Sequence, residues 1–324
     1  MGKTAVILAG GFGTRLRPLT YTTPKPLLPV LNRPMILRLI DTFPEDVTRV
    51  VLAVSYMAEK IREFFAHLDC GREIVVVNEE KPLGTGGAIK NVRDYLTDPF
   101  FVFNADNFSS VNIKEMEGFH KRHGGIGTIA LWEVENPESY GVVRLGESGR
   151  ILEFKEKPKP AEAPSKKINA GIYIFSRKIL DFIPDGEVSL ERTVFPSVIE
   201  YGLYGFEFGG YWIDCGKPAE FLDTNRFLLA QGLGKIESAI EGYVLEPVAV
   251  GKNLRGRGYR LGPNTCIGND CSIGEGTVVS ESVIFDNVEI GNNVRIERSI
   301  IGNGVKISEG KVILEKVVGD GERL

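Results

Sequence analysis

A six-residue period in the last third of the chain constrains its fold more than any other feature. Aliphatic residues recur there in steps of six, interrupted by two steps of five. These heads are Leu261, Ile267, Ile273, Val279, Ile284, Ile290, Ile296, Ile301, Ile307 and Ile313. Glycine follows the head in five of the ten units, and Asn or Asp is frequent at the next positions. Such a sustained period is typical of a solenoid, in which stacked units bury a continuous column of side chains.

Each six-residue unit is predicted to form one flat face of a triangular coil, with its aliphatic head inward and turn-forming residues at the corner. Three units then close one coil, and ten units predict about three coils with exposed ends. The pattern resembles the hexapeptide repeat of left-handed parallel β-helices. An antiparallel meander is the alternative, and a sustained period of six disfavours it.

The first two thirds of the chain alternate two other patterns. Short apolar runs, which predict strands, lie at 4–9, 50–54, 74–77, 100–103 and 126–131. Segments whose apolar residues recur at three and four positions, which predict helices, lie at 58–68, 88–96 and 113–123. This alternation predicts an α/β domain with a mixed, mostly parallel sheet. We expect a catalytic domain at 1–232, a linker at 233–245 and a β-helix domain at 246–324.

Composition excludes several classes of protein. The formal charge of −4 and a pI near 5.7 provide no general basic field, so nucleic acid is not an expected partner. The apolar run at 5–10 is too short for a signal core or a membrane span, and no membrane partner is expected. The four cysteines contain no CxxC pair, which favours a reducing compartment and a cytoplasmic location.

The first predicted strand runs directly into a glycine-rich loop. Residues 10–16 read GGFGTRL, and residues 24–26 read PKP. The glycines allow backbone N–H groups to approach phosphate oxygens, while Arg15 and Lys25 supply the positive charge that a triphosphate needs. The loop is neither a Walker A loop nor a GxGxxG dinucleotide fingerprint.

The loop and the PKP turn resemble the signature of the sugar-1-phosphate nucleotidyltransferases, also called NDP-sugar pyrophosphorylases. The overall layout is most similar to the mannose-1-phosphate guanylyltransferases, followed by glucose-1-phosphate thymidylyl-, uridylyl- and adenylyltransferases. The resemblance implies a Rossmann-like catalytic domain followed by a β-helical tail. It also implies a reaction in which a nucleoside triphosphate and a sugar 1-phosphate give an NDP-sugar and pyrophosphate.

The resemblance assigns the nucleotide to the signature loop, to the segment 78–87, which is similar to the family's Pro-x-Gly-Thr base-binding loop, and to one strand end. These residues are Leu8, Gly10, Gly11, Gly13, Thr14, Arg15, Glu79, Pro82, Gly84, Thr85 and Asp106. A carboxylate at Glu79 accepts hydrogen bonds from guanine, whereas relatives that bind thymine or uracil often carry Gln near this position, so GTP is favoured. The alternative is that Glu79 and Glu80 are merely exposed. Gly86 stands where Ala is common in the family.

Two carboxylates are expected to hold the metal. Asp106 follows the strand at 100–103, and Asp214 lies in the segment WIDCG, which resembles the family's Trp-x-Asp-x-Gly motif. Carboxylate oxygens, phosphate oxygens and water suit Mg²⁺. Ala105 departs from the Gly that the family usually has, and its methyl group could crowd the nucleotide or force a different backbone.

The sugar phosphate is expected at a further set of residues that resemble the family's sugar site, namely Gly141, Glu156, Lys157 and Asn169. Lysine supplies a point charge, while the carboxylate and the amide can hold sugar hydroxyls. The expected catalytic residues are Arg15, Lys25 and Lys157. The identity of the sugar stays open at this point.

Two alternatives concern the tail and the activity as a whole. Some nucleotidyltransferase relatives carry a β-helical acyltransferase that uses a histidine, but no histidine follows His123 here. The tail is therefore expected to serve structure, regulation or homo-oligomer assembly. A non-catalytic regulatory subunit is the second alternative, and the departure at Ala105 is its main support.

Overall fold

The computed structural model describes residues 2–324, which form two compact units. The first unit comprises the residues up to Gly11 together with Leu39–Ile213, and the second comprises Phe12–Arg38 together with Asp214–Leu324. The glycine-rich loop thus leaves the first unit after Gly11 and packs with the C-terminal segment. The expected domains, 1–232 and 246–324 with a linker between them, are continuous segments of the chain, whereas each compact unit combines two segments. The expected domain boundaries remain a prediction.

The first unit is built on a nine-stranded mixed sheet with the order β10-β9-β11-β6-β1-β4-β5, to which β8 and β12 are joined through β11. Strands β6, β1, β4 and β5 pair in parallel, and β11 adds to β6 antiparallel. The strands of this sheet are β1 (Lys3–Leu8), β4 (Val47–Val54), β5 (Glu73–Asn78), β6 (Phe100–Asn104), β8 (Gly127–Glu133), β9 (Gly141–Leu145), β10 (Ile151–Glu156), β11 (Lys167–Phe175) and β12 (Leu203–Glu207). Strands β7 (Asn107–Ser109) and β13 (Trp212–Asp214) pair as a separate two-stranded sheet. The predicted mixed sheet is confirmed.

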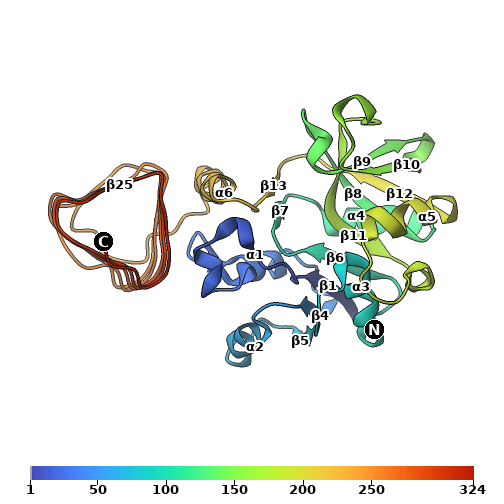
Figure 1. Cartoon of the computed structure of the whole chain (residues 1–324), viewed down its shortest axis with the longest axis horizontal. Helices are drawn as coiled ribbons and strands as arrows, with labels where there is room; N and C mark the ends of the chain where they lie inside the picture. The colour runs from blue at the N-terminus through green and yellow to red at the C-terminus, as the bar shows by residue number, and fades with distance from the viewer. Residues whose placement is uncertain (1) are drawn as a thin grey trace. The chain divides into compact units, whose positions relative to one another are not determined.

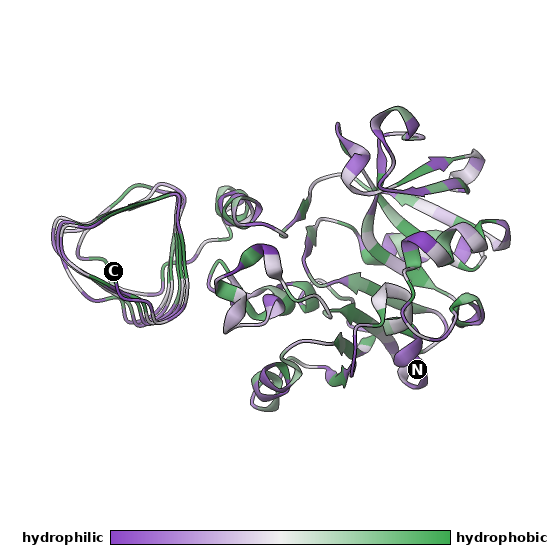
Figure 2. Cartoon of the chain, in the orientation of Figure 1, coloured by the Kyte–Doolittle hydropathy of each residue, from purple (hydrophilic) through white to green (hydrophobic). Residues whose placement is uncertain are grey.

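Hydrophobic side chains of the central strands form the core of this unit, and Figure 2 shows apolar residues concentrated along them. Val6, Val51, Phe100 and Val102 are fully buried because strands covered on both faces expose neither set of alternating side chains. The helices are α2 (Ala58–Ala66), α3 (Gly84–Asn91), α4 (Ile113–His123) and α5 (Phe195–Val198). Among residues 2–324, no helix combines the length and the apolar character that a bilayer crossing requires.

All three predicted helices are present, with shifted boundaries in two of them, since α2 ends at Ala66 rather than at residue 68 and α3 differs at both ends. Helix α4 has the predicted bounds, and its N-cap Asn112 accepts a hydrogen bond from Glu115 N at 3.2 Å. Helix α3 begins four residues before the predicted residue 88 and ends at Asn91, and a separate 3₁₀ turn follows at Arg93–Tyr95. The prediction missed this start because Gly84, Gly86 and Gly87 are poor helix formers in isolation.

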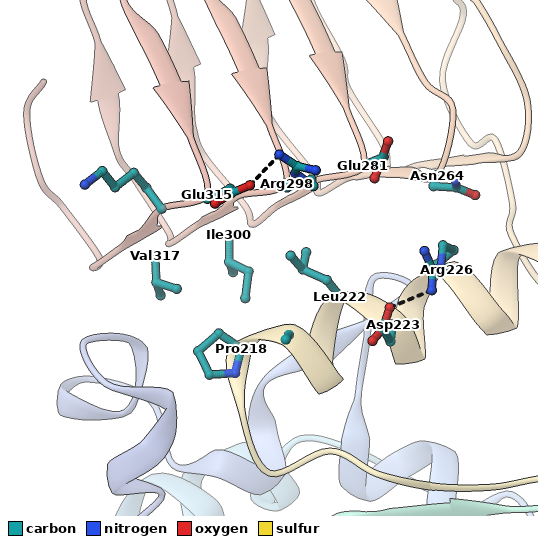
Figure 3. Close-up of a pocket in the computed structure, with 12 residues that line it drawn as sticks. Pro218, Leu222, Asp223, Arg226, Asn264, Glu281, Arg298, Ile300, Glu315 and Val317 are labelled. Atoms are coloured by element: carbon teal, nitrogen blue, oxygen red, sulfur yellow. Dashed lines mark ion pairs between the residues drawn. The ribbon is translucent and has the colours of Figure 1, made fainter.

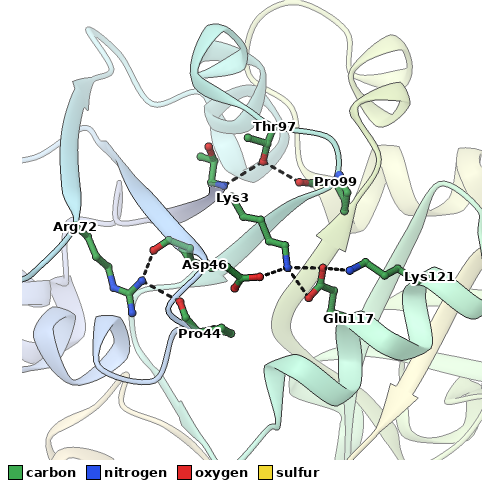
Figure 4. Close-up of polar contacts among 10 residues, drawn as sticks. Lys3, Pro44, Asp46, Arg72, Thr97, Pro99, Glu117 and Lys121 are labelled. Carbon is green, nitrogen blue, oxygen red and sulfur yellow. Dashed lines mark hydrogen bonds and ion pairs between the residues drawn. The ribbon is translucent and has the colours of Figure 1, made fainter. Parts of the chain in front are cut away.

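An ion-pair cluster ties the first strand to α4 (Figure 4). Lys3 Nζ pairs with Asp46 and lies 2.7 Å from the Glu117 carboxylate, and Lys121 Nζ lies 2.6 Å from the same carboxylate. Only 9% of the Glu117 side chain is exposed. Burial acts to raise the pKa of Glu117, but the hydrogen bonds and charges of Lys121 and Lys3 outweigh it and hold the pKa below its ordinary value.

The second unit combines the glycine-rich loop, one long helix and the repeat segment. Its elements outside the repeats are β2 (Pro29–Val30), β3 (Arg33–Pro34), the start of α1 (Met35–Ile40), α6 (Pro218–Ala230) and three 3₁₀ turns at Thr14–Leu16, Leu19–Tyr21 and Lys25–Leu27. The 3₁₀ turns reflect a segment interrupted by Gly13, Pro18, Pro24 and Pro26, which cannot sustain an α-helix.

The repeats form three parallel sheets whose strands stack coil upon coil, and Figure 1 views the coils end-on as a triangle. The strands are β14 (Tyr243–Val244), β15 (Val248–Val250), β16 (Arg260–Leu261), β17 (Thr265–Ile267), β18 (Ser272–Ile273), β19 (Val278–Ser280), β20 (Val283–Ile284), β21 (Glu289–Ile290), β22 (Arg295–Glu297), β23 (Ile300–Ile301), β24 (Lys306–Ile307), β25 (Val312–Leu314) and β26 (Val317–Val318). All ten predicted heads are buried, as a parallel β-helix requires.

The expected number of coils was too low. Two of the three sheets contain five strands each, so the stack extends beyond three coils. Val244 and Val250 continue the six-residue spacing toward the N-terminus, but Gly256 occupies the next position, beside the head Ile273, where an aliphatic side chain would stand. This interruption concealed the first coil from a search for aliphatic heads.

A ladder of Asn and Asp side chains runs along one edge of the coils at 17-residue spacing. It consists of Asn269, Asp286, Asn303 and Asp320. The backbone N–H of Asn269 donates to Asp286 Oδ1 at 2.7 Å, and that of Asn303 donates to Asp320 Oδ1 at 2.7 Å. Each side chain thus satisfies a backbone donor of the preceding coil that no strand pairs.

Replacing Glu117 by Gln should destabilise the first unit by about 1–3 kcal/mol, because Lys3 and Lys121 lose a largely buried charged partner. Because the folded pKa of Glu117 is lowered, its stabilisation is present above the unfolded pKa and is lost as pH falls through the folded pKa. Urea unfolding followed by tryptophan fluorescence measures this unit, since both tryptophans, Trp132 and Trp212, lie in it. The difference from wild type should shrink at acidic pH.

The matched control is Glu135→Gln, which removes an exposed ion pair with Lys166 at 2.6 Å and should leave the unfolding midpoint unchanged. Equal midpoint shifts for the two variants would contradict a special role for the buried cluster.

Candidate active site

Parallel pairing places several predicted residues at one edge of the sheet. Leu8 pairs with Ala53 on one side and with Asn104 on the other, and Val54 pairs with Asn78. The residues that follow these strand ends therefore emerge together at the carboxyl edge, where open α/β sheets bind ligands.

Glu79 is buried at this edge. Its side chain is 5% exposed, its backbone N–H donates to Val54 O at 2.7 Å, and its Oε2 accepts from Leu83 N at 3.1 Å. A Cβ added to Gly10 would lie 3.5 Å from Glu79 Oε1, so the carboxylate faces the first glycine of the loop. Burial raises the pKa of Glu79, and the hydrogen bond from Leu83 opposes this effect. Glu80 is exposed, so the alternative of mere exposure holds for Glu80 and not for Glu79.

The segment after Glu79 is shaped by close backbone contacts. Pro82 is exposed, and Gly84 begins α3 with φ 69, where an added Cβ would lie 2.5 Å from Val188 O. A Cβ on Gly86 would lie 3.1 Å from Val188 Cγ1. Alanine, which the family commonly has at this position, would therefore be tightly packed against Val188 here, and glycine avoids this contact.

The hydroxyl of Thr85 is used inside the protein. It donates to Glu191 Oε2 at 2.8 Å and accepts from Leu190 N at 2.8 Å. The backbone N–H groups of Gly86 and Gly87 are also used inside the protein, since both donate to Val188 O, at 2.8 and 3.3 Å. Glu191 lies in a π-helical segment, Leu190–Val194, and no motif in the sequence indicated that it belongs near the site.

Asp106 follows β6 in a turn, and the backbone N–H of Ala105 donates to Leu8 O at 3.2 Å. Ala105 is not among the non-glycine residues with positive φ. The backbone at this position is therefore one that a residue with a side chain can adopt, while crowding of a nucleotide by the methyl group stays a prediction.

A buried tyrosine connects Asp106 with the expected sugar site. The Tyr173 hydroxyl accepts from Asn169 Nδ2 at 2.9 Å. Burial, followed by the negative charge of Glu191, raises the pKa of Tyr173 well above its ordinary value, and the charges of Glu156 and Asp106 act in the same direction. The charges of three carboxylates therefore act on this hydroxyl, although the sequence analysis did not single out Tyr173.

Asn169 lies at an irregularity in the sheet. The register of β11 against β8 shifts between Asn169 and Tyr173, and Asn169 Oδ1 accepts from Gly171 N at 2.9 Å. Ala170 O, inside the same irregularity, accepts from Asn107 Nδ2 at 2.8 Å and from Trp212 Nε1 at 2.9 Å. Such irregularities redirect side chains and occur frequently beside active sites.

Glu156 and Lys157 end β10. Burial, followed by the charge of Glu191, raises the pKa of Glu156, while Lys157 opposes the shift. Lys157 Nζ lies 3.7 Å from Glu156 Oε1, and the Lys157 backbone adopts φ 50, which is costly for a side chain of this type. A Cβ on Gly141 would lie 2.5 Å from Phe154 Cζ and 3.0 Å from Glu156 Oε2, so glycine is needed to seat both side chains.

The second unit carries the remaining loop residues. Gly13 has φ 62 and precedes the 3₁₀ turn Thr14–Leu16, and a Cβ there would lie 2.8 Å from Thr20 Cγ2 and 3.3 Å from Lys25 Cβ. Gly13 thus allows the loop to close against Lys25. Arg15 lies against Gly216, where an added Cβ would be 2.7 Å from Arg15 Nη2, so this guanidinium is close in space to the segment that contains Asp214. Thr14 and Arg15 are exposed.

A metal ion would have to be held by a small number of protein ligands. Within the described part of the chain, no group of three or more His, Cys, Asp or Glu side chains could bind a metal. Asp106 lies in the turn after β6, and Asp214 is the last residue of β13. Each side chain offers hard carboxylate oxygens, which fit a cation that completes its coordination with phosphate and water.

One cavity in the second unit, of about 370 Å³, contains none of the predicted site residues (Figure 3). It lies between α6 and a coil corner formed by Asn264, Glu281, Arg298 and Glu315, all with positive φ. Arg298 pairs with Glu315, and Arg226 lies 2.8 Å from Asp223, so its charges are largely compensated within the wall. The cavity is therefore separate from the predicted nucleotide and sugar residues.

Comparisons with known proteins match both parts of the chain. Residues 4–231 match the family described as nucleotidyl transferase, and residues 244–322 match the GMPPB C-terminal domain. Mannose-1-phosphate guanylyltransferase 1 of Arabidopsis thaliana is 38% identical over 92% of this chain and 85% of its own length. The mannose-1-phosphate guanylyltransferase catalytic subunit beta of Drosophila pseudoobscura pseudoobscura is 40% identical over 84% of this chain and 72% of its own.

A solved structure shares the fold of most of the chain. HddC from Yersinia pseudotuberculosis, crystallised in complex with GMP-PN, superposes with a TM-score of 0.59 at 28% identity, covering 70% of this chain and 99% of that one. Because a family match spans residues 4–231 and relatives of 38–40% identity span most of the chain, this protein belongs to the nucleotidyl transferase family, together with the mannose-1-phosphate guanylyltransferases.

Proposed function

We propose that this protein is an enzyme that transfers a guanylyl group from GTP to mannose 1-phosphate, giving GDP-mannose and pyrophosphate. The relatives named mannose-1-phosphate guanylyltransferase support this substrate pair. The buried carboxylate of Glu79, facing Gly10 at the carboxyl edge of the sheet, is the observation that carries the choice of base. Thymidylyl, uridylyl or adenylyl transfer to glucose 1-phosphate is the alternative within the same reaction class.

The proposed base site uses Glu79 as a hydrogen-bond acceptor. A carboxylate accepts from the N1–H and N2–H₂ groups of guanine together, whereas thymine and uracil present only one such donor on the equivalent edge. The Glu79 side chain is held in place by the Leu83 N–H, so little conformational freedom is lost when the base binds. The neighbouring residues of the proposed site are Leu8, Gly10, Gly11, Pro82, Gly84 and Thr85.

The proposed reaction needs no protein nucleophile. An oxygen of the sugar 1-phosphate attacks the α-phosphorus of GTP, a new P–O bond forms, and the bond to the bridging oxygen breaks as pyrophosphate leaves with the electron pair. In this proposal Arg15 and Lys25 neutralise the leaving pyrophosphate, the backbone of Gly13 and Thr14 approaches the phosphates, and Lys157 holds the attacking phosphate.

A divalent metal is part of the proposal, and Mg²⁺ is its expected identity. Asp106 and Asp214 would hold it, because their hard oxygen donors suit this cation and leave positions for phosphate and water. When bound, the metal would neutralise charge on the triphosphate.

The proposed sugar site combines Gly141, Glu156, Lys157 and Asn169. Asn169 is oriented by its contacts with Tyr173 and Gly171, and this ordering favours directional hydrogen bonds to hydroxyl groups. The strained backbone of Lys157 supports a functional role for this exposed lysine, since strain of this kind persists mainly where a site requires it.

Further parts of the proposal concern the tail and the setting of the protein. We propose that the coils of residues 246–324 are a left-handed parallel β-helix of the hexapeptide type. We also propose that these coils support homo-oligomer assembly. A cytoplasmic location also remains a prediction. A regulatory, non-catalytic subunit loses its main support, because Ala105 requires no backbone that only glycine could adopt.

Pyrophosphate release tests the proposed function directly. With Mg²⁺ present, GTP, dTTP, UTP, ATP and CTP would be combined in turn with mannose, glucose and glucosamine 1-phosphates. Release that is fastest with GTP and mannose 1-phosphate supports the proposal. Release with a different pair would correct the substrates, and no release from folded protein would contradict the enzymatic function.

Replacing Lys25 by Ala should lower kcat by about 100-fold, because one charge that stabilises the leaving pyrophosphate is lost. Steady-state pyrophosphate release measures this effect. Lys311→Ala, an exposed lysine of the coils, is the matched control and should leave kcat unchanged. An unaltered kcat in Lys25→Ala would remove the role assigned to that residue.

Replacing Glu79 by Gln should lower kcat/KM for GTP by about 10- to 100-fold, because the amide presents a donor to guanine N–H groups where a carboxylate accepts. The wild-type KM for GTP should rise as pH is lowered toward the pKa of Glu79, which burial holds above 4.5, because protonation removes the acceptor. The variant should lack this dependence. Glu80→Gln, at the exposed neighbour, provides the control, and equal effects of both substitutions would count against base recognition by Glu79.

A further inference from the structure

The loop that carries Arg15 and Lys25 belongs to the same compact unit as the coils. Phe12–Arg38 and Asp214–Leu324 form this unit. The loop has only short 3₁₀ turns and two two-residue strands of its own, and most of its internal backbone hydrogen bonds span three or four residues and so close single turns. Contacts with other parts of the unit must therefore determine its conformation.

The last coil holds the loop near its middle. Thr22 Oγ1 donates to Asp320 Oδ2 at 2.7 Å, and Thr23 Oγ1 lies 3.4 Å from the same oxygen. A Cβ added to Gly319 would lie 3.2 Å from Pro18 Cβ, so the loop packs closely on this coil. These contacts join residues that are separated by 298 positions in the chain.

An earlier coil and α6 hold the far end of the same segment. Asn32 Nδ2 donates to Ile267 O at 2.7 Å, and Leu31 N donates to Asn225 Oδ1 at 2.9 Å. Asn225 is 2% exposed, and Cys266 Sγ lies 3.6 Å from its Oδ1. Lys25 thus lies between two attachment points, one at residues 22–23 and one at residues 31–32.

Asp320 serves both the ladder and the loop, and its Oδ2, which faces the loop, also accepts from Asn303 Nδ2 at 3.3 Å. Its Oδ1 accepts from Asn303 N at 2.7 Å, in the same way that Asp286 Oδ1 accepts from Asn269 N at 2.7 Å. Its Oδ2 accepts from Thr22. Asp286 occupies the equivalent place two coils earlier. Both hydrogen bonds described for its side chain come from Asn269 of the ladder.

We infer that the last coil positions the glycine-rich loop. In this inference Asp320 is a positioning residue, which acts on Lys25 and Arg15 through its contacts with Thr22 and Thr23. A carboxylate at this point accepts two hydroxyl hydrogen bonds while remaining anchored to the preceding coil. The coils therefore set the geometry of the triphosphate-binding loop in addition to any part in assembly. This inference rests on the proposed nucleotidyl transfer for its kinetic consequence, but not for its structural one.

Asp320→Ala and Thr22→Val in the full-length protein test the inference. Each should raise the KM for the nucleoside triphosphate by about three- to tenfold, because a partly exposed hydrogen bond to a charged group is lost. The KM for the sugar 1-phosphate should not change. The double variant should show no larger effect than the stronger single variant, since both substitutions remove the same contact.

Asp286→Ala is the matched control, because it removes the equivalent ladder contact without touching the loop, and it should leave both KM values unchanged. Hydrogen exchange measured without substrate provides a second readout. Residues 12–27 should exchange faster in Asp320→Ala and in Thr22→Val, but not in Asp286→Ala.

Several results would overturn the inference. Equal effects of Asp320→Ala and Asp286→Ala would indicate general destabilisation of the coils, and additive effects in the double variant would show that Thr22 and Asp320 are not coupled. Unchanged exchange of residues 12–27 would also refute it. If wild-type protein releases no pyrophosphate with any substrate pair, the proposed function fails, while hydrogen exchange still decides the positioning role. If Asp320→Ala does not fold, Thr22→Val alone decides it.

Discussion

Parallel pairing of β1 with β4 and β6 is the constraint on which the first unit depends. Because Leu8 pairs with both Ala53 and Asn104, the three strands end at one level. Gly10, Glu79 and Asp106 follow β1, β5 and β6, and no long-range motif is needed to bring these segments to one edge. A shift of one residue in this register would turn every buried strand residue toward the opposite face, so the hydrophobic core and the location of the candidate site are specified together.

The same edge carries an unfavourable concentration of carboxylates. Burial raises the pKa of Glu79, and burial together with the charge of Glu191 raises the pKa of Glu156. The ionised forms of both carboxylates are therefore disfavoured relative to carboxylates on the surface. Thr85 and Ser189 donate to Glu191 at 2.8 and 2.7 Å, which compensates one of the three charges. Perturbed carboxylates that persist beside a strand edge are typical of functional sites, because a fold selected for stability alone would replace them.

Local patterns were sufficient for much of the fold, and their limits have physical causes. The aliphatic heads from Leu261 to Ile313 specified inward positions directly, since burial enforces the period. Gly256 interrupted the period of aliphatic heads and concealed the first coil. The start of α3 at Gly84 depends on a tertiary contact with Val188, which no local propensity reports. Likewise, Glu191 and Tyr173 reach the site only through the packing of distant segments, so motif residues were predictable and their partners were not.

The attachment of the glycine-rich loop shows this limit most clearly. In sequence, Asp320 is one more member of a 17-residue ladder and is indistinguishable from Asp286. The two differ in what surrounds their second carboxylate oxygen, and that difference exists only after the coils have stacked and the loop has joined them. The stacking must therefore form before the contact with Thr22 can contribute, because a solenoid without its last coil presents no acceptor at that place. The six-residue period specifies only which side chains point into the coils. An outward side chain such as Asp320 can therefore make a specific contact with another segment while the period stays the same.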